Sequence, residues 1–177
     1  MSEGKFLVTY ASRTGWTEGV AEAVGNTLRG IGASVDVIPM SKVISVANYD
    51  YVVAGSAINS SAWLPEAMEF LNKFQSELRS KPFAAFLVCM TLALKDGEKY
   101  RDQISDWMDP VRALVNPISI GLFAGGLEIK RIPKFNERLM FRLSVLFGFW
   151  KEGDHRNWIK INDWTLNLVR LLKAGNL

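Results

Sequence analysis

Apolar runs alternate with helically spaced apolar positions along most of this 177-residue chain. The runs predict strands over residues 5–10, 51–55, 83–90 and 118–124, and an alternating pattern predicts another over 33–38. Helical spacing predicts a helix from Trp16 and one from about Pro65, with Met68, Leu71, Phe74 and Leu78 on one stripe. Further helices are predicted over 98–115, bent or ended near Pro110, and over 162–173, whereas 41–48 is a weak helix or a loop.

Strands that are apolar throughout and alternate with helices are typical of a parallel sheet covered on both faces. We therefore predict a doubly wound α/β fold, with five parallel strands and helices on both faces. Ligands of such sheets bind outside the carboxyl ends of the strands. The loops after Tyr10, Gly55, Met90 and Ala124 are accordingly expected to converge.

A polar turn, Ser12-Arg-Thr-Gly-Trp-Thr17, joins the first strand to the first helix. It offers three hydroxyls, a glycine and backbone N–H groups at the positive end of a helix, which together suit an anion such as phosphate. A Walker lysine and a GxGxxG pattern are both absent from the turn, so a nucleoside triphosphate or a dinucleotide is disfavoured. Ser and Thr are also common helix caps, and the turn by itself leaves that alternative open.

Length and composition narrow the class of protein. The chain has the size of one domain, 1–177, and its single cysteine, Cys89, lies in an apolar run, so no disulfide framework, metal cluster or iron–sulfur centre is expected. The first residues lack the apolar stretch of a signal peptide, and no run approaches the roughly 20 residues that span a bilayer, which predicts a cytoplasmic location. The net charge is +3, but residues 130–156 carry seven Lys and Arg against three Asp and Glu.

The polar turn matches the [ST]-x-T-G-x-T phosphate loop of flavodoxins, and the chain resembles that family. The resemblance implies FMN as cofactor, with its phosphate held by Ser12, Thr14 and Thr17 and its ring bordered by the second and third loops. The predicted cofactor site comprises Ser12, Arg13, Thr14, Gly15, Trp16, Thr17, Ser56, Ala57, Ile58, Asn59, Ser60, Met90, Thr91, Leu92, Ala93, Leu94, Gly125, Gly126 and Leu127.

Residues 123–164 and the stretch YDYVVAGSAI resemble the menaquinone-dependent protoporphyrinogen IX dehydrogenases. Those flavodoxin-fold enzymes have a segment inserted after the fifth strand, here about 127–160, and a closing Asp-Trp, here Asp163-Trp164. The resemblance implies two-electron flavin chemistry with a quinone or another small-molecule acceptor or donor, and it assigns no catalytic residue. The alternative is a flavodoxin-type electron-transfer protein that docks on redox partners.

Aromatic cover of the flavin ring is the main departure from electron-carrier flavodoxins. The third loop, Met90 to Leu94, supplies no aromatic side chain, so one face of the ring is expected to be open to a substrate. Trp16 or Trp63 could still shield the other face, although Trp63 could equally pack beneath the helix that follows it. His155, the only histidine, is expected to be solvated, because it lies between two charged residues.

Residues 134–150 form a second candidate contact surface. Their large apolar side chains share one face of a predicted helix, and the dozen residues from Leu139 onward span about 18 Å, too short for the roughly 30 Å of bilayer hydrocarbon. The face either packs on the protein's own sheet edge or a sister subunit in a homodimer, or lies on the inner face of a membrane beside the basic residues. Nucleic acid is not among the expected partners. The residues of the predicted face are Phe135, Leu139, Leu143, Leu146, Phe147 and Trp150.

Overall fold

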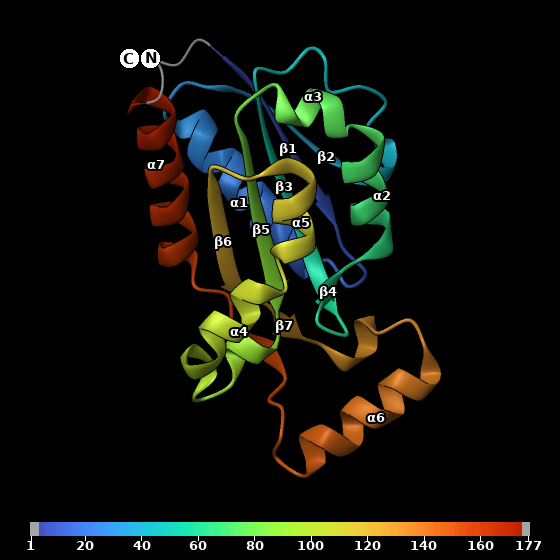
Figure 1. The fold of residues 1–177 in the computed structure, drawn as a ribbon. Coiled ribbons are helices and arrows are strands. Elements are labelled where there is room, and N and C mark those ends of the chain that lie inside the picture. Colours follow the sequence, from blue (N-terminus) through green and yellow to red (C-terminus); the bar gives the residue numbers. More distant parts are fainter. Residues whose placement is uncertain (1–3, 175–177) are drawn as a thin grey trace.

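The computed structural model describes residues 4–174, and its centre is a parallel sheet (Figure 1). Five strands lie in the order β2-β1-β3-β5-β6, and every neighbouring pair is parallel. The strand order reverses between β1 and β3, and in sheets of this type ligands bind in the crevice at that point. The doubly wound fold predicted from the sequence is confirmed. The strands are β1 (Lys5–Ala11), β2 (Ser34–Pro39), β3 (Tyr51–Asn59), β5 (Phe83–Cys89) and β6 (Ser119–Ala124).

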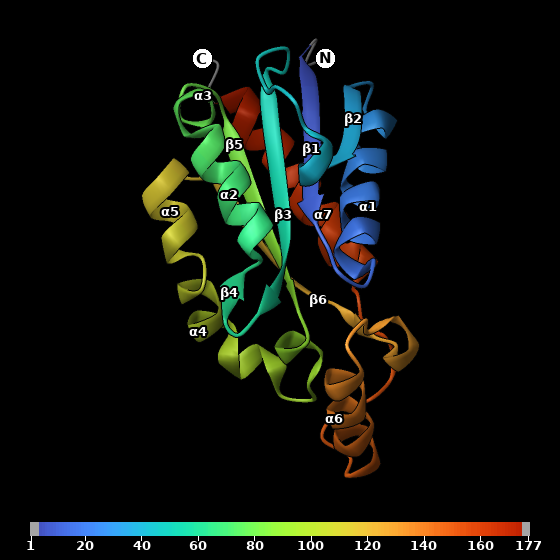
Figure 2. The same cartoon turned by 90° about the vertical axis from the view of Figure 1, so that its right-hand side faces the viewer.

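Helices cover both faces of the sheet (Figure 2). In β1, Phe6 and Val8 are buried beneath one helical layer, and Leu7 is buried beneath the other. This arrangement explains why the strands are apolar throughout, since neither side of the sheet meets water. One layer consists of α1 (Trp16–Gly30) and α7 (Trp158–Ala174), and the other of α2 (Pro65–Lys73), α3 (Gln75–Arg79), α4 (Arg101–Asp106) and α5 (Asp109–Val115).

Several helix and strand boundaries differ from the prediction. The helix from Pro65 breaks at Phe74, although its predicted stripe still faces the core. The predicted helix over 98–115 is two helices, because the chain turns at Trp107 and Pro110 lies in the first turn of α5, where its missing N–H costs nothing. Finally, α7 starts at Trp158, four residues earlier than predicted. Short 3₁₀ turns occupy Met40–Lys42, Thr91–Ala93, Gly97–Tyr100 and Ile129–Arg131.

The closing Asp-Trp pair contributes a packing residue to the core. The indole N–H of Trp164 donates to Ser119 Oγ at 3.0 Å, and its ring meets Phe86 and Phe123 edge-on. Trp164 therefore fastens α7 to the edge strand β6.

An inserted segment follows β6 and leaves the sheet. It contains β7 (Gly126–Leu127), α6 (Phe135–Leu146) and β8 (Gly153–Asp154), and β7 pairs with β8 in antiparallel fashion. Both cartoon views place α6 beyond the carboxyl edge of the sheet (Figures 1 and 2). None of the 12 residues of α6 is buried, so the predicted packing on the protein's own sheet edge is wrong. The helix also ends at Leu146, which leaves Phe147 and Trp150 outside it.

Across residues 4–174, no helix combines the length and the apolar composition that crossing a membrane requires.

Candidate functional site

The loops after β1, β3, β5 and β6 converge at the carboxyl edge of the sheet. They enclose a cavity of about 320 Å³, and a smaller hollow of about 180 Å³ adjoins it. The larger volume lies within the roughly 300–1,000 Å³ that small-molecule sites occupy. Of the predicted site residues, the larger cavity is lined by Thr14, Trp16, Thr17, Ala57, Ile58, Asn59, Ser60, Met90, Thr91, Gly125 and Gly126, and the smaller hollow adds Arg13 and Leu127.

The turn from Ser12 to Thr17 presents the amino end of α1 to this cavity. Gly15 has a φ of 83°, a left-handed conformation that favours glycine, and its N–H donates to Ser12 Oγ at 3.0 Å. Within residues 4–174, no side chain caps the amino end of α1, so the interpretation of the hydroxyls as helix caps is wrong. The first N–H groups of α1 are therefore open to an external anion. Ser12 and Gly15 shape this turn and do not line the cavity.

The second loop is a tight hairpin. Strand β3 runs four residues further than predicted, to Asn59, and doubles back as β4 (Ala62–Trp63). The two turn residues, Ser60 and Ser61, have φ values of 50° and 61°, which non-glycine residues adopt at a cost. Both serines line the larger cavity.

Two other residues of this loop are structural. Ser56 is fully buried, and its hydroxyl donates to the Ala57 carbonyl and accepts from the Leu64 N–H at 3.0 Å. Trp63 is 4% exposed, and its indole N–H points to Met108 Sδ at 3.1 Å. Trp63 therefore packs in the core together with residues of the following helix, and it lines neither the cavity nor the adjoining hollow.

Only Met90 and Thr91 of the third loop line the larger cavity. Leu92 packs against the core on the α2 side, whereas Ala93 and Leu94 face a separate groove of about 440 Å³ beside His155. Cys89, which the prediction assigned to the core, also lines the cavity, and its carbonyl accepts the N–H of Gly125 at 3.0 Å. Burial raises the pKa of the Cys89 thiol, so it is neutral at ordinary pH.

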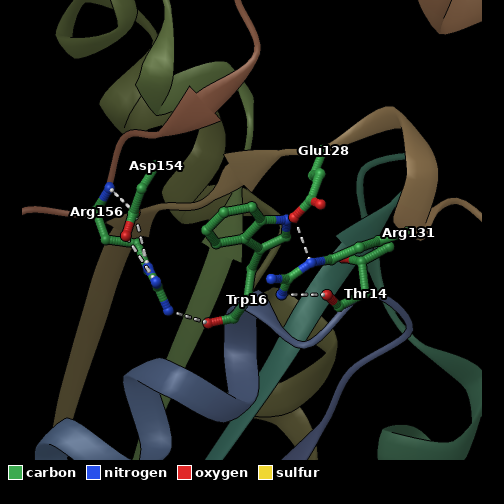
Figure 3. Close-up of polar contacts among 6 residues, drawn as sticks. All are labelled: Thr14, Trp16, Glu128, Arg131, Asp154 and Arg156. Atoms are coloured by element: carbon green, nitrogen blue, oxygen red, sulfur yellow. Dashed lines mark hydrogen bonds and ion pairs between the residues drawn. The ribbon is translucent and has the colours of Figure 1, made fainter.

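The side chain of Trp16 is clamped between two arginines of the inserted segment (Figure 3). The guanidinium carbons of Arg131 and Arg156 lie 5.1 and 4.7 Å from the centre of its ring. Arg156 also donates to the Trp16 carbonyl at 3.3 Å, and Arg131 donates to the Thr14 carbonyl at 3.4 Å. Gly126 makes this packing possible, because a Cβ there would lie 2.6 Å from the indole. The clamp thus joins the inserted segment directly to the polar turn.

Acidic neighbours hold the two arginines in place. Asp154 Oδ2 lies 2.7 Å from Arg156 Nη2, and this hydrogen bond is the main cause that lowers the pKa of the Asp154 carboxyl. Glu128 Oε2 forms an ion pair with Arg131 Nε. Near the amino end of α1, the Tyr10 hydroxyl donates to Glu18 at 2.8 Å. Burial first, and Glu18 second, raise the pKa of Tyr10 to about 12, so this phenol keeps its proton.

Three aromatic side chains that the predicted site did not include line the cavity. Trp107 comes from the junction of α4 and α5, and Phe141 and Trp150 come from the inserted segment. The third loop supplies no aromatic side chain, as predicted, but these three residues from other segments bring aromatic rings to the cavity that the prediction did not consider. Phe141 lies on the opposite side of α6 from the predicted apolar face, so the helical spacing of the apolar residues did not indicate that it lines the site.

His155 is half-buried and bonded, in contrast to the solvated residue that was expected. Its backbone N–H donates to the Gly125 carbonyl at 3.1 Å, and its Nε2 lies 2.8 Å from the Lys151 carbonyl. The backbone bond holds the end of the inserted segment beside the end of β6, whereas the side-chain contact lies within the segment itself.

A larger groove, of about 820 Å³, lies at the opposite end of the sheet. Its basic side chains already have partners: Arg79 donates to the Leu114 carbonyl, and Lys81 donates to two backbone carbonyls. Because ligands of doubly wound sheets bind at the carboxyl edge, we place the candidate site in the cavity of about 320 Å³ at that edge and not in this groove.

Comparison with known proteins identifies relatives of this arrangement. The sequence model of the flavodoxin domain family matches residues 7–147. The protoporphyrinogen IX dehydrogenase (quinone) of Escherichia coli K12 is 26% identical over 166 residues, which cover 90% of this chain and 88% of that protein. Oxidised flavodoxin 2 from Bacillus cereus has a TM-score of 0.60 at 16% identity, covering 94% of this chain and 98% of that one. Oxidised flavodoxin 1 from the same organism has a TM-score of 0.52 at 17% identity, covering 81% and 97%. The two solved flavodoxins share the fold of this chain.

Proposed function

Since this chain belongs to the flavodoxin domain family, we propose that it binds FMN non-covalently at the carboxyl edge of its sheet. The observation that carries the proposal is the uncapped amino end of α1, which opens onto the cavity beside Thr14 and Thr17. Backbone N–H groups and hydroxyls in this position suit the dianionic phosphate of FMN. Arg131, whose guanidinium lies next to the turn, adds a positive charge that the sequence prediction did not include.

The remaining lining residues would border the ring of the cofactor. Residues 57–59, Met90 and Thr91, and Gly125 and Gly126 form the walls of the cavity. Bound FMN supplies the capacity to accept and donate one or two electrons. With FMN bound, the aromatic side chains around the cavity would shield the ring from water, which would strengthen the electrostatic influence of the surrounding groups.

The proposed activity is a two-electron oxidation of a small molecule with a quinone as electron acceptor. Its support is the E. coli relative, which is named protoporphyrinogen IX dehydrogenase (quinone) and aligns with 90% of this chain. The inserted segment after β6 lies within the aligned length and contributes Phe141 and Trp150 to the cavity. The competing proposal is a flavodoxin-type electron-transfer protein, for which the similarity to two solved flavodoxins is the support.

FMN binding is tested by titration of the purified protein, with Thr14→Ala as the variant and Thr27→Ala as its control. Both substitutions remove one hydroxyl, but Thr27 lies on α1 away from the cavity and bonds Ala23 and Asn162. A hydrogen bond to a charged acceptor contributes about 1.5–3 kcal/mol, so Thr14→Ala should weaken FMN binding by roughly tenfold to hundredfold. The control should bind as the wild type does. A folded wild-type protein that takes up no FMN would refute the proposal.

The two activities are separated by anaerobic reduction of the FMN-loaded protein. Direct passage from the oxidised to the fully reduced spectrum, together with turnover of a short-chain naphthoquinone, would support the oxidoreductase. Two well-separated reduction steps without quinone turnover would support the electron-transfer protein.

A further inference from the structure

The outer side of α6 is an apolar surface that faces solvent. Phe135, Leu139, Leu143 and Leu146, with Phe147 directly after the helix, are 76%, 50%, 48%, 77% and 71% exposed. These five side chains are called the outer face of α6 below. In a helix, residues 135, 139, 143 and 146 recur every three or four positions and lie on one side. Large apolar side chains gathered in one exposed patch are characteristic of an interaction surface.

Exposed basic side chains lie beside the outer face and beyond both ends of α6. Residues 130–156 carry seven Lys and Arg against three Asp and Glu, so the segment is more basic than the chain as a whole, whose net charge is +3. Arg142 is exposed and lies within one helical turn of both Leu139 and Leu146. Lys130 and Lys151, also exposed, flank α6 at its two ends. An apolar stripe bordered by cations is the composition of helices that lie in the headgroup region of anionic membranes.

The opposite side of α6 belongs to the candidate site. Phe141 lines both hollows of the site, and Glu137 lines the smaller one. An α-helix with its side chains is about 10–12 Å across, so one helix separates the outer face from the cavity. A surface that contacts the outer face would therefore lie about one helix diameter from the cavity.

We propose that the outer face of α6 docks the protein on an anionic lipid surface and brings the cavity to a lipid-borne electron acceptor. The docking itself rests on exposure and charge alone, whereas the role of the acceptor rests on the proposed function. At about 18 Å, the 12-residue helix is shorter than the bilayer core, so it lies along the interface.

Charge favours a lipid surface over a second copy of this chain as the occupant. A two-fold symmetric dimer would place the same patch of both copies face to face. Such an arrangement would bring two basic segments together, with Arg142 of each copy beside the shared apolar contact. An anionic headgroup layer covers the same apolar side chains and gains from the positive charge.

The test is co-sedimentation of the full chain with vesicles, measured by protein content and not by activity. Vesicles of phosphatidylglycerol and phosphatidylcholine in equal parts are compared with vesicles of phosphatidylcholine alone. We expect binding to the anionic vesicles, weakened when salt rises from about 0.1 M to 1 M and the Debye length falls from about 10 Å to 3 Å. Leu143→Ser and Phe147→Ser should each lower the partition coefficient by about tenfold, and the two changes together by more.

Phe141→Ser is the matched control, because it places the same substitution on the same helix but on the side of the cavity. It should leave vesicle binding unchanged while it weakens FMN binding. Wild-type protein that ignores anionic vesicles overturns the proposal. So does a wild-type dimer that dissociates when Phe147 is replaced, since the outer face is then a contact between copies. Vesicle binding by a protein that takes up no FMN would retain the docking surface and refute only the proposed function.

Discussion

Replacing Gly126 with alanine tests whether the Trp16 clamp is as tight as it is described above. A Cβ at this position would lie 2.6 Å from two carbon atoms of the indole, well inside van der Waals contact. The ring cannot simply swing away, because the guanidinium groups of Arg131 and Arg156 hold it (Figure 3). Either the ring leaves its two cationic partners or the backbone of β7 moves away from the polar turn.

The cost follows from these contacts. Overpacking of this kind costs about 1–3 kcal/mol, and each lost cation–π contact about 0.5–2 kcal/mol depending on exposure. Only the change that costs less free energy needs to occur, so the two costs do not add. Alanine also reduces the conformational entropy of the unfolded chain, which offsets about 0.4–1 kcal/mol of this loss of stability. We expect Gly126→Ala to lower the free energy of unfolding by about 1–2 kcal/mol, and to weaken FMN binding because Trp16 follows Gly15 in the turn.

Gly30→Ala provides the control. Gly30 is the last residue of α1, it has no positive φ, and a Cβ there would have no neighbour within 4 Å. Only the effect on the unfolded chain remains, so this variant should be as stable as the wild type or more stable by about 0.4–1 kcal/mol. The assay is urea unfolding followed by far-ultraviolet circular dichroism, with FMN titration on the same samples. If Gly126→Ala behaves like Gly30→Ala in both measurements, Trp16 is not clamped as described.

Three further outcomes are expected. Ser61→Gly should raise the free energy of unfolding by up to about 1 kcal/mol, because a left-handed conformation costs a non-glycine residue about 1–2 kcal/mol, and a urea midpoint below that of the wild type would contradict this. FMN at about 100 times its dissociation constant should raise the free energy of unfolding by about 2.7 kcal/mol, and thermal unfolding with and without FMN measures it. The pKa of Asp36 is lowered by hydrogen bonds from Lys5 first and Tyr49 second. The stability that Asp36 contributes should therefore be present above the ordinary pKa of about 3.9 and be lost as pH falls through the lower folded pKa. Measured as the urea midpoint against pH, this acid-induced loss should be absent from Asp36→Asn.

The fold could be predicted because its main signals are local. Each buried strand is apolar on both sides, as β1 shows, where Phe6 and Leu7 enter different helical layers. Boundaries were less predictable from apolar spacing alone. Helix α7 starts at Trp158 because the preceding residue caps it: Asn157 Oδ1 accepts the N–H of Lys160 at 3.0 Å, a local signal that apolar spacing does not register. By contrast, Arg156 stacks on Trp158 and reaches across to Trp16, and no local pattern encodes a contact between such distant parts of the chain.

The candidate site was only partly predictable, for the same physical reason. The polar turn from Ser12 to Thr17 is continuous in sequence, so its residue types and its match to a known phosphate loop together indicate an anion. Trp107 and Phe141 come from segments far along the chain, and only the tertiary fold brings them to the cavity. Phe141 was also hidden by the rule that the most apolar side of a helix is buried. In α6 that rule fails, because the most apolar side faces solvent.

This reversal bears on why α6 is held where it is. A helix of about 12 residues is marginal in water, and packing of its apolar side usually stabilises such a helix. Here the contacts that hold the inserted segment lie elsewhere: β7 pairs with β8, Glu152 accepts the N–H of Ile129 at 2.9 Å, and Arg156 binds Trp16. The outer face takes part in none of them, so its substitution should leave the segment in place. Its exposed leucines and phenylalanines therefore contribute little to folding, which leaves them free for the proposed contact with a lipid surface.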